Sequence, residues 1–141
     1  MKYGRVGTGT VFLSVDLGSR FELHSGAPGK AMLAYLPEEE SNEIIKKLTL
    51  TKYNERTIST KKELKKELAE IRKRGFAIDR AEQFDGCHCV GAVIRDHRDY
   101  PIAMVWASTT SFSLPESKFA QVGELLSKHV ELISEKFGHK L

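Results

Sequence analysis

Residues 75 to 94 read GFAIDRAEQFDGCHCVGAVI and contain two apolar runs separated by a polar turn. The run from Phe76 to Arg80 predicts a short strand that leaves a helix at Gly75, and the run from Cys87 to Arg95 predicts a longer strand. The length of the second apolar run indicates a central strand that is covered on at least one face. The acidic residues, glycine and cysteines of the turn therefore lie at one end of a sheet, where pockets form.

The flanking residues extend this pattern in both directions. Upstream, Thr60 to Glu63 form a capping-box sequence and open a helix that ends at Gly75. Downstream, Asp96 to Pro101 predict a hairpin loop before a third strand from Ile102 to Thr109. Pro115 then opens a final helix, whose apolar stripe packs on the sheet. The stripe comprises Phe119, Val122, Leu126, Val130, Ile133 and Phe137.

The first third of the chain predicts a hairpin followed by two helices. Thr10 to Val15 alternates weakly as a strand, and Asp16 to Ser19 supplies a turn before a returning strand at Phe21 to His24. Lys30 to Leu36 has helical composition, and a second helix opens with a proline and three glutamates and runs from Pro37 to about Leu48. The full order describes an α+β fold, with helices packed against an antiparallel sheet.

The composition is that of one soluble globular domain. The chain has 141 residues, of which 40% are hydrophobic and 29% charged, and no apolar run approaches the ~20 residues that a membrane span requires. The N-terminus has no long apolar segment after its early lysine, so we expect no secretory signal and a cytoplasmic location. We expect Cys87 and Cys89 to be reduced and not to pair, because neighbouring strand positions point to opposite faces.

The charge pattern does not indicate a nucleic-acid surface. A net charge of +3 arises from 22 basic and 19 acidic residues, which is nearly even. The basic residues gather between Lys61 and Arg74, where Glu63, Glu67 and Glu70 are interleaved with them. This pattern is typical of the solvated face of an amphipathic helix.

Three motifs carry a resemblance to a known family. Asp79 and Glu82 match a D-x-x-E segment, and Gly86 and Cys89 match a G-x-x-C turn. His24 to Ala34 match the pattern H-x-x-x-x-G-K-A-x-L-A. In these motifs the chain resembles the effector-binding domain of the IclR family of bacterial and archaeal transcription regulators. The resemblance extends to the C-terminal helix and implies a GAF/profilin-like fold, an antiparallel sheet with flanking helices.

The resemblance also implies a domain organisation and partners. Family members carry a winged helix-turn-helix ahead of this domain, whereas only about two dozen residues precede His24 here. We therefore expect residues 1 to 141 to form a single effector-binding domain with no DNA-binding domain, as an excised fragment or a shortened form of a regulator. DNA would be bound only through the helix-turn-helix domain that this chain lacks. Effector domains of the family form dimers and tetramers, so the resemblance implies a homo-oligomer.

The implied function is to bind a small organic acid or a sugar-derived metabolite in a pocket. The loop that leads into the helix at Lys30 presents unpaired backbone N–H groups that suit a carboxylate. Pro28 lacks an N–H group, so one contact of the family type cannot form, and Trp106 is larger than the residue often found at its position. The ligand-binding residues that the resemblance implies are Ala27, Pro28, Asp79, Cys89, Trp106 and Ser108.

Several of these residues also have plainer interpretations. Asp79 could be a solvated turn acid, or it could form an ion pair with Arg80 or Arg95. Cys89 and Trp106 could be ordinary core residues. The residues alone leave these alternatives open.

The Cys-His-Cys sequence invites a zinc interpretation, which we do not favour. Consecutive strand residues diverge, and no second Cys/His pair completes a tetrahedral site. We therefore expect no structural metal and no cofactor. The alternative that stays open is an adventitious or effector-assisting metal ion held by Cys89 and Asp79, with His24 as a further candidate ligand.

We expect no catalytic residues. Gly29-Lys30 fails the phosphate-loop pattern because Ala31 follows the lysine, and neither a Ser-His-Asp set nor a close carboxylate pair indicates hydrolysis. The prediction is thus a ligand-sensing domain without turnover. The alternative is a GAF-like thiol enzyme such as a free methionine sulfoxide reductase, with Cys87 and Cys89 as nucleophile and resolving thiol.

Overall fold

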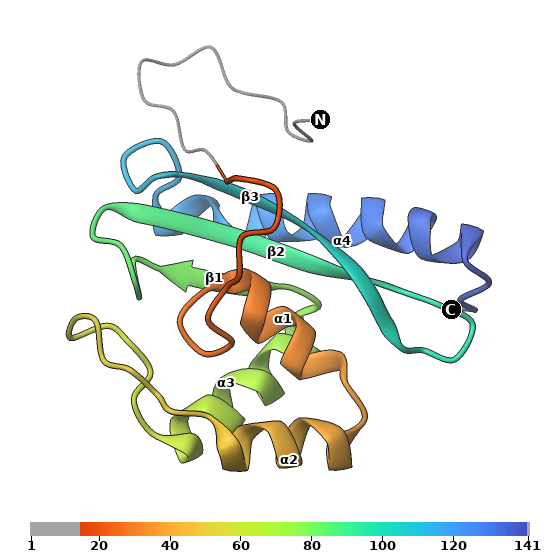
Figure 1. Ribbon diagram of the computed structural model, residues 1–141. Coiled ribbons are helices and arrows are strands. Elements are labelled where there is room, and N and C mark those ends of the chain that lie inside the picture. The colour runs from red at the N-terminus through yellow and green to blue at the C-terminus, as the bar shows by residue number, and fades with distance from the viewer. Residues whose placement is uncertain (1–14, 141) are drawn as a thin grey trace.

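The computed structural model describes residues 15 to 140, in which a three-stranded sheet is covered by helices on both faces (Figure 1). One face carries the C-terminal helix, and the other carries the three helices that precede the sheet in sequence. No helix in this part of the chain has the length and apolar character needed to cross a membrane. In chain order the elements are α1 (Ala27–Tyr35), α2 (Glu38–Lys47), α3 (Lys61–Arg74), β1 (Ala77–Arg80), β2 (Cys87–Arg95), β3 (Pro101–Thr110), η1 (Glu116–Lys118) and α4 (Phe119–Lys136).

Strand β2 is the centre of the sheet. The strand order is β1-β2-β3, and both neighbouring pairs are antiparallel. Val90, Ala92 and Ile94 pack in the core on the α4 side, whereas Cys89 and Val93 pack in the core with α1 and α3. Coverage of both faces is the physical reason for the long apolar run in β2. The arrangement confirms the predicted α+β fold and the central strand.

Helix α3 begins and ends as its sequence predicts. The Thr60 side chain accepts the backbone N–H of Glu63, the Glu63 side chain accepts the Thr60 N–H, and Gly75 follows with a left-handed φ of 86°. Leu64 and Leu68 are buried, whereas the lysines of α3 are exposed. The interpretation of this basic segment as a solvated helix face is therefore confirmed.

The apolar stripe of α4 is confirmed except at its last member. Phe119 and Val130 are buried against the sheet. Phe137, which the pattern placed on the same stripe, is 53% exposed. The helix ends at Lys136, and the Phe137 backbone departs from helical values with φ −94° and ψ 13°. The prediction for Phe137 is wrong because helical spacing defines a common face only while the helical backbone continues.

The predicted N-terminal hairpin falls largely outside the described residues. Only the last residue of Thr10 to Val15 lies within them. The turn at Asp16 to Ser19 is confirmed by a 3.1 Å backbone hydrogen bond between its end residues. The strand predicted at Phe21 to His24 is wrong, since this segment has no strand structure. Its backbone packs against the start of α1 so closely that a Cβ atom on Gly29 would lie 2.3 Å from a carbonyl oxygen.

Helix α1 begins at Ala27, three residues before the predicted start at Lys30. Gly26 caps it in an extended conformation, with φ −143° and ψ 156°. Pro28 lies in the first turn, where a missing N–H group costs no hydrogen bond. Glycine and proline break helices in their interiors but fit at their N-terminal ends, which explains the misplaced boundary.

Candidate ligand-binding site

Three polar side chains form a row across the inner face of the sheet, the face that carries α1 and α3. Asp79 on β1 is the register partner of Cys89 on β2, which pairs in turn with Ser108 on β3. Directly paired residues point to the same side of a sheet. The Cys89 Sγ atom lies 2.9 Å from the Ser108 Oγ atom. The tertiary structure therefore brings together three of the side chains on which the predicted pocket depends.

Asp79 faces the interior. It is 6% exposed, and its Oδ1 atom accepts the backbone N–H of Glu82 at 2.8 Å. Arg80 and Arg95, its candidate partners, form ion pairs with other acids. Burial raises the pKa of Asp79, and the Glu82 N–H offsets part of that rise. The interpretations of Asp79 as a solvated turn acid or an ion-pair partner of these arginines are therefore wrong.

The N-terminus of α1 lies over the sheet beside this row. A Cβ atom on Gly91, which pairs with Trp106, would lie 3.6 Å from the Cβ atom of Ala27. Ala27 and Pro28 are both buried. The first N–H groups of a helix have no partners inside the helix and carry the positive end of its dipole. This end of α1 therefore supplies hydrogen-bond donors near the row, with one donor missing at Pro28.

Cys87 shares the inner face with Cys89, contrary to the prediction that the two cysteines diverge. Positions i and i+2 of a strand point the same way, and the two sulfur atoms are 4.0 Å apart. The Ser108 Oγ atom is 3.5 Å from the Cys87 sulfur. The hydrogen bond from Cys89 lowers the pKa of Cys87 to about 6, whereas the hydrogen bond to Cys87 and burial raise the pKa of Cys89. Both residues are free thiols.

The Cys-His-Cys sequence does not converge on a single metal position. His88 lies on the opposite face, where its Nδ1 atom is 2.8 Å from the Leu114 carbonyl oxygen. His24, a further candidate ligand, has its Nε2 atom 2.9 Å from the Thr51 carbonyl oxygen. Among residues 15 to 140, no three His, Cys, Asp or Glu side chains are grouped so as to hold a metal ion.

A buried ion pair, which sequence reasoning missed, joins α1 to the turn after β1. Lys30 is fully buried, and its Nζ atom donates to both carboxylate oxygens of Glu82, at 2.7 and 2.8 Å. The same atom donates to the Ile78 carbonyl oxygen at 2.6 Å and lies 3.6 Å from a Glu67 oxygen. Burial raises the pKa of Glu82, and Lys30 offsets part of that rise. Lys30 belongs to the H-x-x-x-x-G-K-A-x-L-A motif and Glu82 to the D-x-x-E motif. These motifs are the sequence signal that could have indicated the ion pair.

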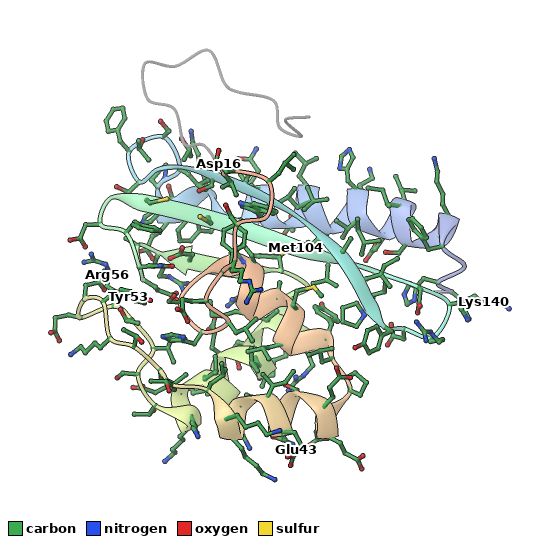
Figure 2. All side chains as sticks on the ribbon, in the orientation of Figure 1. Asp16, Glu43, Tyr53, Arg56, Met104 and Lys140 are labelled. Carbon is green, nitrogen blue, oxygen red and sulfur yellow. The ribbon has the colours of Figure 1, made fainter. Side chains whose placement is uncertain are left out.

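The turn between β1 and β2 is also held by the loop that precedes α3. Asn54 and Arg56 donate side-chain hydrogen bonds to the Ala81 carbonyl oxygen, at 2.8 and 3.2 Å. The Thr57 hydroxyl donates to the Glu82 carbonyl oxygen at 2.6 Å. Figure 2 shows Arg56 on this loop, at the end of the sheet where β1 turns into β2. The residues around Asp79 are therefore positioned from both α1 and this loop.

Trp106 is half-buried and belongs to neither core cluster formed among residues 15 to 140. Its ring meets the edge of Phe21, with centroids 5.6 Å apart. Met104, labelled on β3 in Figure 2, packs against the core on the same face. Trp106 is therefore a partly buried residue of β3, and both its role in the core and its contact with a ligand stay predictions.

Two hollows lie at the other end of the sheet, away from this row. One, of about 930 Å³, is formed by the hairpin between β2 and β3 and by the residues after α4. The other, of about 580 Å³, lies between the same hairpin and the end of α1. Neither is lined by Asp79, Cys89 or Ser108. The candidate site therefore rests on the row and the helix N-terminus, not on either hollow.

Comparison with known proteins shows the family to which the chain belongs. The chain matches the family described as bacterial transcriptional regulator IclR C-terminal, over residues 6 to 135. The chain belongs to the IclR family. It corresponds to the effector-binding, C-terminal domain of IclR-type regulators, as the D-x-x-E, G-x-x-C and H-x-x-x-x-G-K-A-x-L-A motifs predict.

Individual IclR-type relatives agree with this assignment. The chain is 33% identical over 130 residues to the HTH-type transcriptional repressor AllR of Escherichia coli (strain K12), covering 92% of this chain and 48% of AllR. The crystal structure of the Thermotoga maritima IclR is 38% identical, with a TM-score of 0.88, and is matched over 94% of this chain and 54% of that one. The repressor BlcR of Agrobacterium tumefaciens is 28% identical, with a TM-score of 0.81 and coverages of 91% and 51%.

These relatives are longer than this chain, two of them are named as repressors, and the two solved structures share its fold. The chain spans about half the length of the curated relatives it matches. AllR and BlcR are named as repressors, not as enzymes. The structural likenesses confirm the predicted IclR-type α+β fold.

Proposed function

We propose that this domain binds a small organic acid or sugar-derived metabolite between the N-terminus of α1 and the inner face of the sheet, and senses it without turnover. The observation that carries the proposal is the row of Asp79, Cys89 and Ser108 beside the start of α1. In an intact IclR-type regulator, binding would shift the relative placement of subunits in a dimer or tetramer, and thus the spacing of their helix-turn-helix domains. The residues assigned to the ligand are Ala27, Pro28, Asp79, Cys89, Trp106 and Ser108.

The chemistry of the row favours an acid with further oxygen atoms. The N-terminal end of α1 attracts a carboxylate through its N–H groups and dipole. The Ser108 hydroxyl can donate or accept a hydrogen bond, and the Asp79 carboxyl, protonated, donates to a ligand oxygen. These groups bind polar oxygen atoms, while buried Ala27 and partly buried Trp106 contribute apolar surface.

Binding without catalysis is favoured over the thiol-enzyme alternative. The 4.0 Å separation of the Cys87 and Cys89 sulfur atoms is the one observation that suits a nucleophile and a resolving thiol. The named repressors among the relatives suit a sensor instead. We expect the protein not to consume free methionine sulfoxide in the presence of a thiol reductant, which mass spectrometry measures directly.

The ligand should stabilise the folded domain through Asp79. In a thermal-shift screen of small carboxylates and keto acids, we expect at least one compound to raise the unfolding midpoint, because a ligand that binds only the folded state adds about 2.7 kcal/mol at a hundred times its Kd. The Asp79→Ala variant should lose this shift. Glu43→Gln, which removes an exposed carboxylate on α2, is the matched control and should keep it.

Retention of the full shift by Asp79→Ala would place the ligand elsewhere on the domain. The loss is interpretable only if the variant unfolds cooperatively without ligand, which the same melting curve shows. An unshifted midpoint for every acid and sugar acid tested with the wild-type chain would contradict the proposed ligand class.

The pH dependence of binding follows from the raised pKa of Asp79. A protonated Asp79 donates to an anionic ligand, so affinity should increase as the pH falls through that pKa, by up to about tenfold per pH unit above it. Isothermal titration calorimetry between about pH 5 and pH 8 measures this slope. Asp79→Asn, whose amide donates at every pH, should bind with a flatter profile. Affinity that decreases on acidification would instead show that Asp79 binds the ligand in its ionised form.

A further inference from the structure

Two thiols lie next to each other at the start of β2, in a chain that has two cysteines in all. The sulfur atoms of Cys87 and Cys89 are 4.0 Å apart, and the Ser108 hydroxyl oxygen lies within 3.5 Å of both. We propose that these cysteines form a peroxide-reactive dithiol that closes into an intramolecular disulfide. This reaction is independent of the ligand proposed above, because it requires only the two thiols and a hydroperoxide.

The two thiols differ in access and reactivity. Cys87 is half-buried at the first position of β2, whereas Cys89 is 7% exposed within the strand ladder. The hydrogen bond from Cys89 lowers the pKa of Cys87 to about 6, which favours the Cys87 thiolate over that of Cys89. The thiolate is the reactive form of cysteine. A hydroperoxide therefore reacts first with Cys87, and Cys89 is the resolving thiol.

The oxidation proceeds in two steps. The Cys87 thiolate attacks one oxygen of the hydroperoxide and the O–O bond breaks, which yields a sulfenic acid on Cys87 and an alkoxide that takes up the proton lost by the thiol. The Cys89 sulfur then attacks the sulfenic sulfur, the S–O bond breaks, and hydroxide leaves with the Cys89 proton as water. Two thiols are oxidised to one disulfide, and the hydroperoxide is reduced by two electrons to an alcohol and water.

Closure would take place at the first position of β2, next to an exposed turn. A disulfide bond is about 2 Å long, so the sulfur atoms must approach each other by about 2 Å. Cys87 follows Gly86, whose φ of 73° ends an exposed turn, and a Cβ atom on Gly86 would meet no atom within 4 Å. Closure therefore displaces Cys87 at the end of the ladder, and the hydrogen bonds from Ser111 N–H to the Gly86 carbonyl oxygen and from Cys87 N–H to the Phe84 carbonyl oxygen must adjust. Disulfides in such small rings are strained and readily reduced, which suits a reversible modification.

Closure would also change the inner face of the sheet. It removes the Cys89 thiol that contacts the Ser108 hydroxyl, and it displaces the turn that connects β1 to β2. We expect the oxidised domain to lose the ligand-induced thermal shift. This consequence alone rests on the proposed function, whereas the oxidation itself does not.

Thiol counting tests the proposal directly on the wild-type chain. After treatment with hydrogen peroxide and denaturation, we expect both thiols to be lost together and the intact mass to fall by about 2 Da, the two hydrogens of a disulfide. The product should run as a monomer on a non-reducing gel, and dithiothreitol should restore both thiols. Survival of both thiols, or oxidation only to cross-linked dimers or to sulfinic acid, would overturn the proposal.

Single variants test the assigned roles. Cys89→Ser should accumulate a Cys87 sulfenic acid that dimedone traps, and Cys87→Ser should react at least about tenfold more slowly than the wild type. Equal rates in the two variants would contradict the assignment of Cys87 as the reacting thiol. If either variant fails to fold, peptide mapping of the oxidised wild-type chain locates the same bond. Absence of a ligand shift in the reduced protein would count against the proposed function and leave this result unaffected.

Discussion

Replacing Lys30 with methionine is expected to lower the free energy of unfolding by about 3 to 5 kcal/mol, because it leaves a buried carboxylate without its partner. Lys30 is fully buried, and it donates to both oxygens of Glu82, which is itself 4% exposed. Methionine matches the length of the lysine stem but supplies no charge and no donor. Urea unfolding at neutral pH measures the difference from the change in midpoint at constant slope.

The effect of Lys30→Met should diminish as the solution is acidified. Burial raises the pKa of Glu82 in the folded protein, so the folded state favours the neutral carboxyl. The free energy of unfolding therefore decreases as the pH rises through that pKa and the buried carboxyl ionises. Without Lys30, the pKa of Glu82 rises further, and protonation at lower pH removes the unpaired charge. A destabilisation that stays constant across the titration would show that lost packing, not the charge, is responsible.

Two further variants separate the pair from its surroundings. Lys46→Met removes an exposed lysine that contacts Glu43 at 2.6 Å, and it should change stability by less than about 1 kcal/mol. Adding Glu82→Gln to Lys30→Met removes the stranded charge and should recover part of the loss. The double variant should therefore be more stable than Lys30→Met alone.

Replacing Gly29 with alanine is expected to destabilise the domain by about 3 kcal/mol or more, the upper end of the range for overpacking. A Cβ atom at this position would lie 2.3 Å from the Glu22 carbonyl oxygen and 2.5 Å from the Leu23 Cα atom. These are backbone atoms, which cannot rotate away as a side chain would. Helix propensity alone predicts the opposite sign, a gain of about 1 kcal/mol for alanine over glycine, so the clash must exceed that gain. Thermal or urea unfolding measures the outcome.

The neighbouring Gly26 supplies the control. A Cβ atom there would lie 3.6 Å from the Pro28 Cδ atom, which is an ordinary contact. Gly26→Ala should therefore cost no more than about 1 kcal/mol, the usual penalty for a poor N-cap residue. Because Gly29 lies in the first turn of α1, its substitution should also displace the helix end assigned to the ligand and abolish the thermal shift. Equal stability of the two alanine variants would refute the close approach at Gly29.

The element order after residue 25 was predictable because each element carries its signal locally. The capping box at Thr60 and the glycine at Gly75 define α3, and the apolar run before Arg95 defines β2. The errors lie where local signals are ambiguous. Gly26 and Pro28 look like loop residues but form the start of α1. The segment from Phe21 to His24 has strand-like composition, yet it packs its backbone against α1 rather than pairing with a strand.

The candidate site was predictable in part, and mainly through the family motifs. Sequence reasoning named Asp79, Cys89 and Ser108, and the strand register places them in one row. It assigned no role to Lys30, because a lysine on a helix is ordinarily exposed and nothing local indicates a carboxylate 52 residues away. It also misjudged Cys87, although a strand period of two is enough to place Cys87 and Cys89 on the same face.

The sequence by itself determined the order of the four α-helices and the three strands among residues 15 to 140, that the fold is α+β, and that the chain is an IclR-type domain. These properties depend on hydrophobic spacing and helix capping, which act over a few residues, and on motifs, which are recognised from residue identities alone. Only the tertiary structure decided that Lys30 is buried against Glu82, that Asp79 faces inward, and that two thiols meet at Ser108. The physical reason is that burial, register and charge pairing are set by distant segments packing together, which no local pattern records.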